Sequence, residues 1–163
     1  MTFKTPDLCD EFEAELGKTV RVVAPMFQRY GGRATFSGQI VTLKIFEDNS
    51  LVREAFAEDG QGKVLVIDGG GSIRCALVGD QLAILAHKNG WEGVVVYGCI
   101  RDSVDINGID IGVRALNTHP QKSIKKGVGD RDIAVTFGGV TFNRGEFLYA
   151  DDDGVLVSVK SLC

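Results

Sequence analysis

Runs of apolar residues separated by glycine-rich segments predict most of the secondary structure of this chain. The runs at residues 39–46, 63–67 and 93–97 are rich in β-branched residues and predict strands. Shorter runs at residues 20–24 and 113–116 predict two further strands, of which the second is weaker. The segments KVLVI and GVVVY are apolar throughout, so these two strands are expected to be buried.

Helix signals alternate with these strands. Residues 5–7 (Thr-Pro-Asp) predict a helix start with Thr5 as the N-cap, and Gly17 predicts its end. Residues 48–50 (Asp-Asn-Ser) are expected to cap a second helix. Residues 75–89 are expected to be helical in part.

The remaining segments are rich in glycine. Residues 26–38 contain three glycines and predict a loop. The last third of the chain predicts short strands joined by tight turns, and residues 151–154 (Asp-Asp-Asp-Gly) predict an acidic turn rather than a calcium loop. Helices among the early strands and β-structure late in the chain predict an α/β fold, with residues 1–163 as a single domain.

Composition narrows the classes of protein to consider. The net charge of −4 and the pI of about 5.2 argue against direct binding of nucleic acid, which needs a basic surface. No apolar run approaches the roughly 20 residues of a membrane span, and the acidic N-terminal segment does not resemble a signal peptide. The four cysteines form no C-x-x-C pair and are expected to be free thiols, so a cytoplasmic location is expected.

Asp80, Arg101 and Asp102 are the best candidates for chemistry. Arg101 and Asp102 follow the apolar strand at residues 93–97, where α/β folds commonly bind ligands. One carboxylate can hold a divalent cation, a second can hold its water, and a guanidinium can bind an anion. The competing interpretation is structural, with Asp80 and Asp102 as helix caps and Arg101 on the surface.

The segment Gly79-Asp80-Gln81-Leu82 is expected to open a helix, and its free N–H groups can bind a carboxylate or a phosphate. The glycines at residues 69–71 also follow an apolar strand, where a backbone can approach a ligand, but no nucleotide-binding motif is present. Lys122, Lys125 and Lys126 surround Ser123 and are expected to lie in a solvated loop.

The chain resembles a known family over nearly its whole length. The resemblance is to the regulators of ribonuclease activity A and the related class II 4-hydroxy-4-methyl-2-oxoglutarate aldolases. The matching segments, in order, are PDLCD, YGGRATFSGQIVTLKIFEDNSLV, GKVLVIDGGGSIRCALVGDQLA, NGWEGVVVYGCIRD, IDIGVRALNTHP and VTFGGVTFNRGEFLYADDDGVLVS. The resemblance implies a swivelling β/β/α fold, as in phosphohistidine domains, and a ring-shaped homotrimer with clefts between subunits.

The resemblance also implies roles for the candidate residues. In aldolases, the segment matching Gly79, Asp80, Gln81 and Leu82 binds the pyruvyl group, and the arginine matching Arg101 contacts the substrate. The aspartate matching Asp102 binds Mg²⁺ or Mn²⁺, and the one matching Asp80 helps to hold the water shell of the metal.

Two functions follow as expectations. The first is cleavage of a small 2-oxo acid, 4-hydroxy-4-methyl-2-oxoglutarate, to two pyruvates, with oxaloacetate decarboxylation as a side activity. The presence of Asp80, Arg101 and Asp102 together favours this lyase. The longer aldolases have a C-terminal extension with a further carboxylate, and this chain is expected to lack it. The second function is inhibition of ribonuclease E or binding to a related helicase, and a methyltransferase is a third, weaker alternative.

Overall fold

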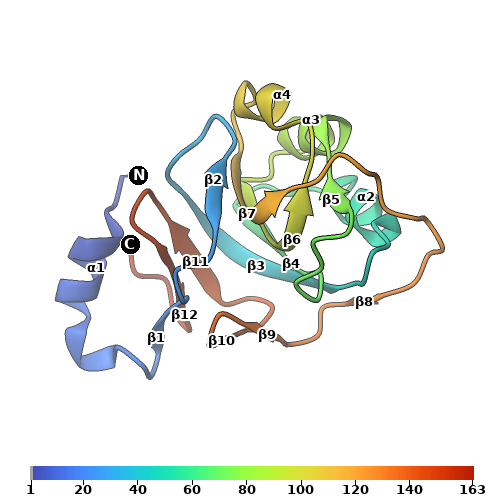
Figure 1. Ribbon diagram of the computed structural model, residues 1–163. Helices are drawn as coiled ribbons and strands as arrows, with labels where there is room; N and C mark the ends of the chain where they lie inside the picture. Colours follow the sequence, from blue (N-terminus) through green and yellow to red (C-terminus); the bar gives the residue numbers. More distant parts are fainter. Residues whose placement is uncertain (1) are drawn as a thin grey trace.

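The computed structural model describes residues 2–163, and ten of its strands form one large sheet (Figure 1). Eight of them lie in the spatial order β1 (Val20–Val22), β12 (Val155–Ser158), β11 (Phe147–Ala150), β3 (Phe36–Lys44), β4 (Lys63–Asp68), β6 (Gly93–Ile100), β7 (Gly112–Thr118) and β2 (Gln28–Tyr30). Two short strands join this path, since β5 (Ala76–Val78) pairs with β6 and β8 (Asp130–Arg131) pairs with β3. A separate hairpin contains β9 (Val135–Phe137) and β10 (Val140–Phe142).

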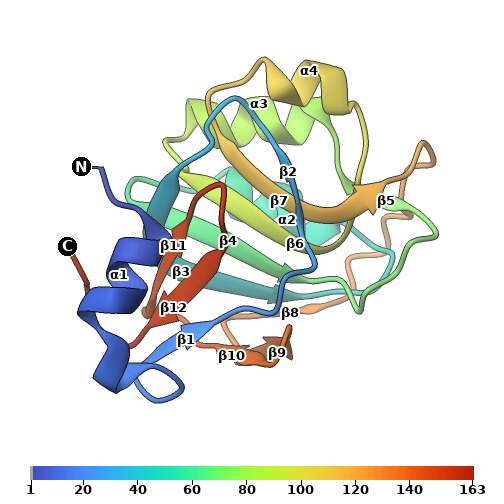
Figure 2. The same ribbon diagram turned by 60° about the vertical axis from the view of Figure 1, so that its left-hand side comes forward.

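Residues 2–163 also contain four α-helices and one 3₁₀ helix, of which α1 and η1 precede the first strand and the others lie between strands. They are α1 (Thr5–Glu11), the 3₁₀ helix η1 (Glu13–Glu15), α2 (Ser50–Phe56), α3 (Asp80–Lys88) and α4 (Ser103–Asn107). Figure 2 shows α3 and α4 at one end of the molecule, and α1 beside β12 at the other.

The centre of the sheet is parallel and is covered on both faces. Strands β3, β4, β6 and β7 pair in parallel. Along β4, Val64 and Val66 belong to one apolar cluster, whereas Leu65 and Ile67 belong to another. Successive side chains of a strand point to opposite faces, so both faces of β4 are buried. This arrangement explains why the strand is apolar at every position.

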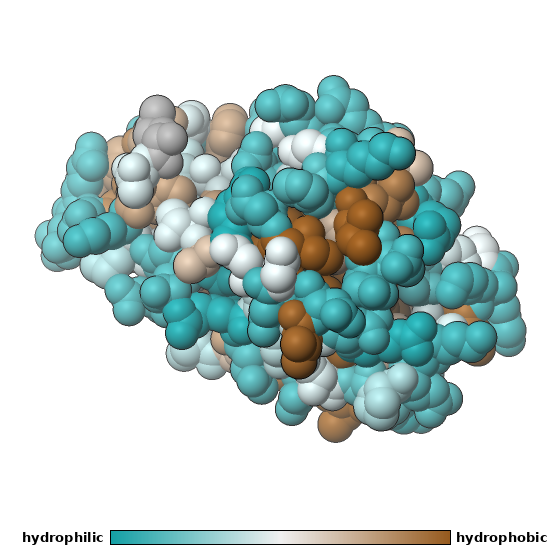
Figure 3. All heavy atoms as spheres, turned by 90° about the horizontal axis from the view of Figure 1, so that it is seen from above, coloured by the Kyte–Doolittle hydropathy of each residue, from teal (hydrophilic) through white to brown (hydrophobic). Residues whose placement is uncertain are grey.

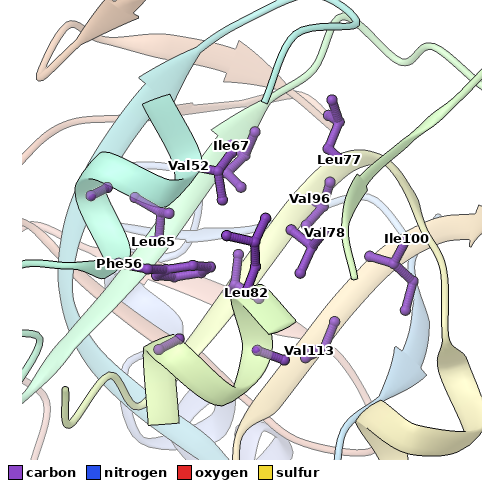
Figure 4. Packing of buried hydrophobic residues seen from close by; sticks show 14 of the residues in the cluster. Val52, Phe56, Leu65, Ile67, Leu77, Val78, Leu82, Val96, Ile100 and Val113 are labelled. Atoms are coloured by element: carbon purple, nitrogen blue, oxygen red, sulfur yellow. The ribbon is translucent and has the colours of Figure 1, made fainter. Parts of the chain in front are cut away.

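Helices α2 and α3 cover one of these faces. Val52 and Phe56 of α2 and Leu82 of α3 lie in one buried cluster with Leu65 and Val96 of the sheet (Figure 4). The opposite face packs against the β9–β10 hairpin through a second buried cluster. Leu82, which is 5% exposed, belongs to the first of these clusters. Its packing therefore fixes the first turn of α3, which contains the candidate segment, against the sheet.

The N-terminal helix packs on the other end of the sheet, but its predicted boundaries are wrong. Lys4 occupies the N-cap position, and Thr5 is the first helical residue. The side chain of Thr5 is engaged elsewhere, because its hydroxyl donates to Asp151 Oδ1 at 2.7 Å. The α-helix ends at Glu11 and continues as η1, so Gly17, at φ +76°, lies in the turn beyond both helices.

The prediction of a loop for residues 26–38 is also wrong in part. Gln28–Tyr30 forms the edge strand β2, which pairs with β7, and β3 already begins at Phe36. The polar sequence Gln-Arg-Tyr has no apolar alternation, and β2 exists because β7 offers it a free edge. The strands predicted at residues 63–67, 93–97 and 113–116 are confirmed, as is the α/β fold of the swivelling β/β/α type. The strand predicted at residues 39–46 exists but ends at Lys44.

None of the helices within residues 2–163 has the length and apolar character that a transmembrane span requires.

Candidate functional site

The two predicted site segments lie together at one edge of the sheet. Strand β5 ends at Val78, and the chain turns at Gly79 into α3. The backbone N–H of Arg101, just beyond β6, donates to the carbonyl oxygen of Val78 at 2.9 Å. This bond places Arg101 and Asp102 directly beside the start of α3.

Asp102 directs its carboxylate toward α3 rather than toward its own helix. It occupies the N-cap position of α4 with a left-handed backbone (φ +58°), and its side chain makes no capping bond to α4. Instead, Asp102 Oδ2 accepts a hydrogen bond from the N–H of Asp80 at 3.2 Å and lies 4.0 Å from Arg101 Nε. A non-glycine residue at positive φ is uncommon, and here it turns the carboxylate toward the candidate segment.

The first turn of α3 presents further backbone donors. Gly79 is the N-cap in an extended conformation, and the first helical hydrogen bond runs from Ala83 N–H to Gly79 O at 3.1 Å. The N–H groups of Gln81 and Leu82 precede this bond, so they have no partner within the helix. Together with the positive end of the helix dipole, they favour an anion at this position.

These groups line a cavity of about 160 Å³. The structure brings all six predicted residues to it, namely Gly79, Asp80, Gln81, Leu82, Arg101 and Asp102. The wall also contains residues for which no site role was predicted, namely Asn49, Arg53, Ala76, Lys122 and Lys125. Four side chains in the wall are cationic and two are anionic, so the cavity suits a small ligand with more than one negative charge.

The prediction that Lys122, Lys125 and Lys126 lie in a solvated loop is confirmed, because all three are exposed. It missed that Lys122 and Lys125 also line the cavity. Their loop follows β7 and returns to the site, where Gln121 O accepts a hydrogen bond from Ala76 N–H at 2.8 Å. Ser123 is buried, and its Oγ accepts a hydrogen bond from Asn49 N–H at 3.2 Å. In the sequence, only the cluster of lysines around Ser123 indicated that this loop could contribute to the site.

Asp48 holds the same loop in place. Its Oδ2 accepts hydrogen bonds from the N–H groups of Lys126 at 2.8 Å and Val128 at 3.2 Å. Its Oδ1 accepts from the N–H of Ser50 at 3.0 Å, at the start of α2. Burial would raise the pKa of this carboxyl, but these hydrogen bonds outweigh burial and lower its pKa to about 2. Asp48 is thus ionised at neutral pH and ties the lysine loop to α2.

Two other candidate segments are occupied by internal bonds. In the glycine loop, Gly70 N–H donates to Asp68 Oδ1 at 2.9 Å and Gly71 N–H donates to Tyr97 O at 3.1 Å, so these donors are not free for a ligand. Residues 151–154 form the predicted turn between β11 and β12, and Asp151 is bonded to Thr5.

A larger cavity, of about 550 Å³, lies between the segment of residues 22–29 and this acidic turn. It contains none of the six predicted residues, so the smaller cavity remains the candidate site.

The donor set in the smaller cavity fits a hard divalent cation. Within residues 2–163, no group of three or more histidine, cysteine, aspartate or glutamate side chains is placed to hold a metal. Asp80 and Asp102 are the two carboxylates in the cavity wall. Mg²⁺ is commonly bound by one or two carboxylates while it keeps several waters, so a site with few protein ligands suits Mg²⁺ or Mn²⁺ better than zinc.

A family model described as Aldolase/RraA, of the RraA-like group, matches residues 5–157. The chain belongs to the Aldolase/RraA family. Among curated relatives, a protein of Dechloromonas aromatica (strain RCB) is 88% identical over 162 residues, which is 99% of both chains. A protein of Aromatoleum aromaticum is 65% identical over the same share of both chains. Both carry the name "Putative 4-hydroxy-4-methyl-2-oxoglutarate aldolase".

Solved structures of Aldolase/RraA relatives carry other names. A Geobacillus kaustophilus protein described as an S-adenosylmethionine:2-dimethylmenaquinone methyltransferase is 50% identical, with a TM-score of 0.94 over 98% of this chain and 97% of its own. The RNA-processing inhibitor RraA from Thermus thermophilis is 42% identical, with a TM-score of 0.92 over 98% of this chain and 94% of its own. Relatives with this fold are thus described as an aldolase, a methyltransferase and an RNA-processing inhibitor. Because the fold alone does not determine the function, the function has to be argued from the site.

Gly79→Ala tests the geometry of the site in this Aldolase/RraA protein. Gly79 has φ −118°, which alanine adopts freely, but an added Cβ would lie 2.9 Å from Asp102 Oδ2. The carboxylate must therefore move, while the fold has no reason to change. We expect apparent Mg²⁺ affinity to fall about 10- to 100-fold, as it does when the support of a ligand is lost, with little change in the thermal midpoint.

Isothermal titration with Mg²⁺ and a thermal melt measure these two effects. Gly154→Ala is the matched control, because an added Cβ at Gly154 meets no atom within 4 Å. An unchanged Mg²⁺ affinity in Gly79→Ala would show that the position of the Asp102 carboxylate does not matter for the metal.

Proposed function

We propose that this protein cleaves 4-hydroxy-4-methyl-2-oxoglutarate to two molecules of pyruvate, with oxaloacetate decarboxylation as a side activity. One observation carries the proposal, which is that the start of α3, Arg101 and Asp102 line the same small cavity. A carboxylate-binding helix start, a guanidinium and a carboxylate pair are the groups that a metal-assisted reaction of a 2-oxo acid requires.

The charges of the cavity match this substrate. The two carboxylates of the substrate need cationic or N–H partners at both of its ends. In this proposal, the N–H groups of Gln81 and Leu82 and the guanidinium of Arg101, all in the cavity wall, bind the pyruvyl end. Lys122 and Lys125, from the loop after β7, bind the carboxylate on C4.

Cleavage breaks the bond between C3 and C4. The electrons of that bond move to the 2-oxo group and give a pyruvate enolate, while the C4 hydroxyl loses its proton to solvent and becomes the carbonyl of the second pyruvate. The enolate then takes up a proton from solvent at C3 and becomes the first pyruvate. A divalent cation held by Asp102, with Asp80 beside it, supplies Lewis-acid polarisation of the 2-oxo group when bound. Arg101 adds a fixed positive charge that favours the developing oxyanion.

The size of the cavity favours the lyase over the methyltransferase. Pockets for drug-sized ligands are commonly about 300–1,000 Å³, whereas this cavity is about 160 Å³. A four- to six-carbon acid suits such a volume, and S-adenosylmethionine is much larger. The glycine loop at residues 69–71, whose N–H groups are bonded internally at Gly70 and Gly71, offers no alternative phosphate or nucleotide cradle.

We further propose a homotrimer in the cytoplasm, as the resemblance implies. Figure 3 looks down on the side of α3 and α4 and shows apolar patches within a mostly hydrophilic surface. Val104 of α4 is 85% exposed and Ile84 of α3 is 47% exposed, and such side chains favour association with another surface. All four cysteines are free thiols, which suits a reducing compartment.

Pyruvate release from oxaloacetate tests the proposed function directly. With Mg²⁺, the protein is expected to release pyruvate faster than Mg²⁺ alone, because its cavity adds positive charge at the developing enolate. A coupled lactate dehydrogenase assay measures the rate. EDTA is expected to abolish the difference, and equal rates with and without protein would rule out the lyase.

Inhibition of ribonuclease E is the second candidate function. It is supported by the 42% identity to the Thermus protein described as an RNA-processing inhibitor. The net charge of −4 would favour a basic, disordered segment of the ribonuclease as the docking partner.

A further inference from the structure

Arg53 is a cation in the wall of the candidate cavity whose side chain has no polar partner within residues 2–163. Every other arginine of the chain forms an ion pair with a carboxylate or donates a hydrogen bond to a carbonyl oxygen. Arg53 is also exposed, so its guanidinium is accessible to a ligand in the cavity. An accessible arginine without an anionic partner in a cavity wall is suited to bind an anionic group of the ligand.

Helix α2 brings Arg53 to the site. Asn49, at the N-cap, and Arg53 are about one helical turn apart, so they lie on the same face of α2. Asn49 Nδ2 donates a hydrogen bond to the carbonyl oxygen of Leu77 at 3.0 Å, which joins this face to β5. Strand β5 leads directly into Gly79 and the start of α3. Arg53 therefore enters the cavity from α2, whereas Arg101 enters it from the end of β6.

The cavity has more cationic groups than the pyruvyl end of the substrate requires. Arg101 and the start of α3 are assigned to that end, which leaves Arg53, Lys122 and Lys125. All three belong either to α2 or to the loop that Asp48 joins to the start of α2. The second carboxylate of a dicarboxylic acid is the group that these cations can bind. Of the three, only the arginine can bind a carboxylate through two parallel N–H groups.

We propose that Arg53 is a specificity-determining residue that binds the second carboxylate of the substrate and favours aldol cleavage over decarboxylation. This inference rests on the proposed lyase function. In aldol cleavage, the carboxylate on C4 keeps its charge and becomes the carboxylate of the second pyruvate, so Arg53 binds it equally well in the ground state and in the transition state.

Oxaloacetate differs because its second carboxylate is the leaving group. The C3–C4 bond breaks, its electrons move to the 2-oxo group, and the carboxylate leaves as neutral CO₂. The enolate then takes up a proton from solvent at C3. The charge that Arg53 binds is lost as this bond breaks, so Arg53 stabilises the ground state more than the transition state and slows decarboxylation.

Arg53→Gln separates the two reactions in the full-length protein with Mg²⁺. For 4-hydroxy-4-methyl-2-oxoglutarate, kcat/KM is expected to fall on the order of 10- to 100-fold, mainly through KM, because a hydrogen-bonded charge pair is lost. For oxaloacetate, kcat and KM are expected to rise together, while kcat/KM changes less than about threefold. Pyruvate release in the coupled lactate dehydrogenase assay measures both reactions, and thermal melts establish that each variant is folded.

Arg144→Gln is the matched control, because Arg144 is an exposed arginine outside the cavity wall, and it is expected to leave both activities unchanged. Arg53→Lys keeps the charge without the paired N–H groups, so its aldol activity is expected to lie between those of wild type and Arg53→Gln. A fall in kcat for oxaloacetate in Arg53→Gln, or an unchanged kcat/KM for the aldol substrate, would overturn the role of Arg53 while the wild-type activity leaves the lyase function intact. An inactive wild-type protein would overturn both proposals together.

Discussion

Replacing Asp102 by asparagine is expected to lower kcat/KM for oxaloacetate decarboxylation by about 10³-fold and to remove its dependence on Mg²⁺. Asparagine has the same shape and can still accept the hydrogen bond that Asp80 N–H makes at 3.2 Å. The variant thus removes the negative charge while it preserves the local structure. Loss of a Lewis acid worth several kcal/mol accounts for an effect of this size.

A titration of the decarboxylation rate with Mg²⁺, together with calorimetric Mg²⁺ binding, measures this effect. Asp105→Asn is the matched control, because Asp105 is an exposed carboxylate on the same helix that does not line the cavity. Wild-type Mg²⁺ affinity in Asp102→Asn would contradict the assignment of Asp102 as the metal ligand.

The same variant separates the two candidate functions. An inhibitor that acts by docking on a ribonuclease does not need a metal ligand in a cavity of about 160 Å³. If the protein inhibits ribonuclease E, Asp102→Asn is expected to keep that inhibition while it loses the lyase activity.

The second large effect is expected for Arg101→Lys, with a loss of about 10²- to 10³-fold in kcat/KM. A guanidinium binds a carboxylate through two parallel N–H groups, whereas an ammonium group acts as a single point charge. Loss of one well-placed donor to a developing oxyanion has an effect of this order. Little stability is at risk, since the guanidinium of Arg101 makes only a long bond to Pro120 O, at 3.4 Å, and a 4.0 Å contact to Asp102.

Steady-state kinetics with both substrates test this expectation. Arg74→Lys is the matched control, because Arg74 is an exposed arginine that pairs with Glu47 and does not line the cavity. An unchanged kcat/KM in Arg101→Lys would mean that Arg101 does not bind the substrate through two parallel N–H groups of its guanidinium.

Much of the fold follows from local sequence patterns. The run KVLVI predicts β4 because a strand buried on both faces is apolar at every position. The start of α3 after Gly79 also follows from the local sequence. By contrast, β2 and the start of α1 depend on partners distant in the sequence, namely the free edge of β7 and Asp151, which binds Thr5. Local patterns contain no information about such partners.

The sequence by itself determined the apolar strands of the sheet, the helix start at Gly79 and the presence of Arg101 and Asp102 beyond a strand. The tertiary structure decided which residues share the cavity with them. Asn49 and Lys125 reach it because Ser123 and Asp48 join the loop after β7 to the start of α2, through hydrogen bonds between residues 74 to 80 positions apart. A buried polar group destabilises the fold unless it forms a hydrogen bond. The partners of these groups are far away in the sequence, so only the folded chain determines them.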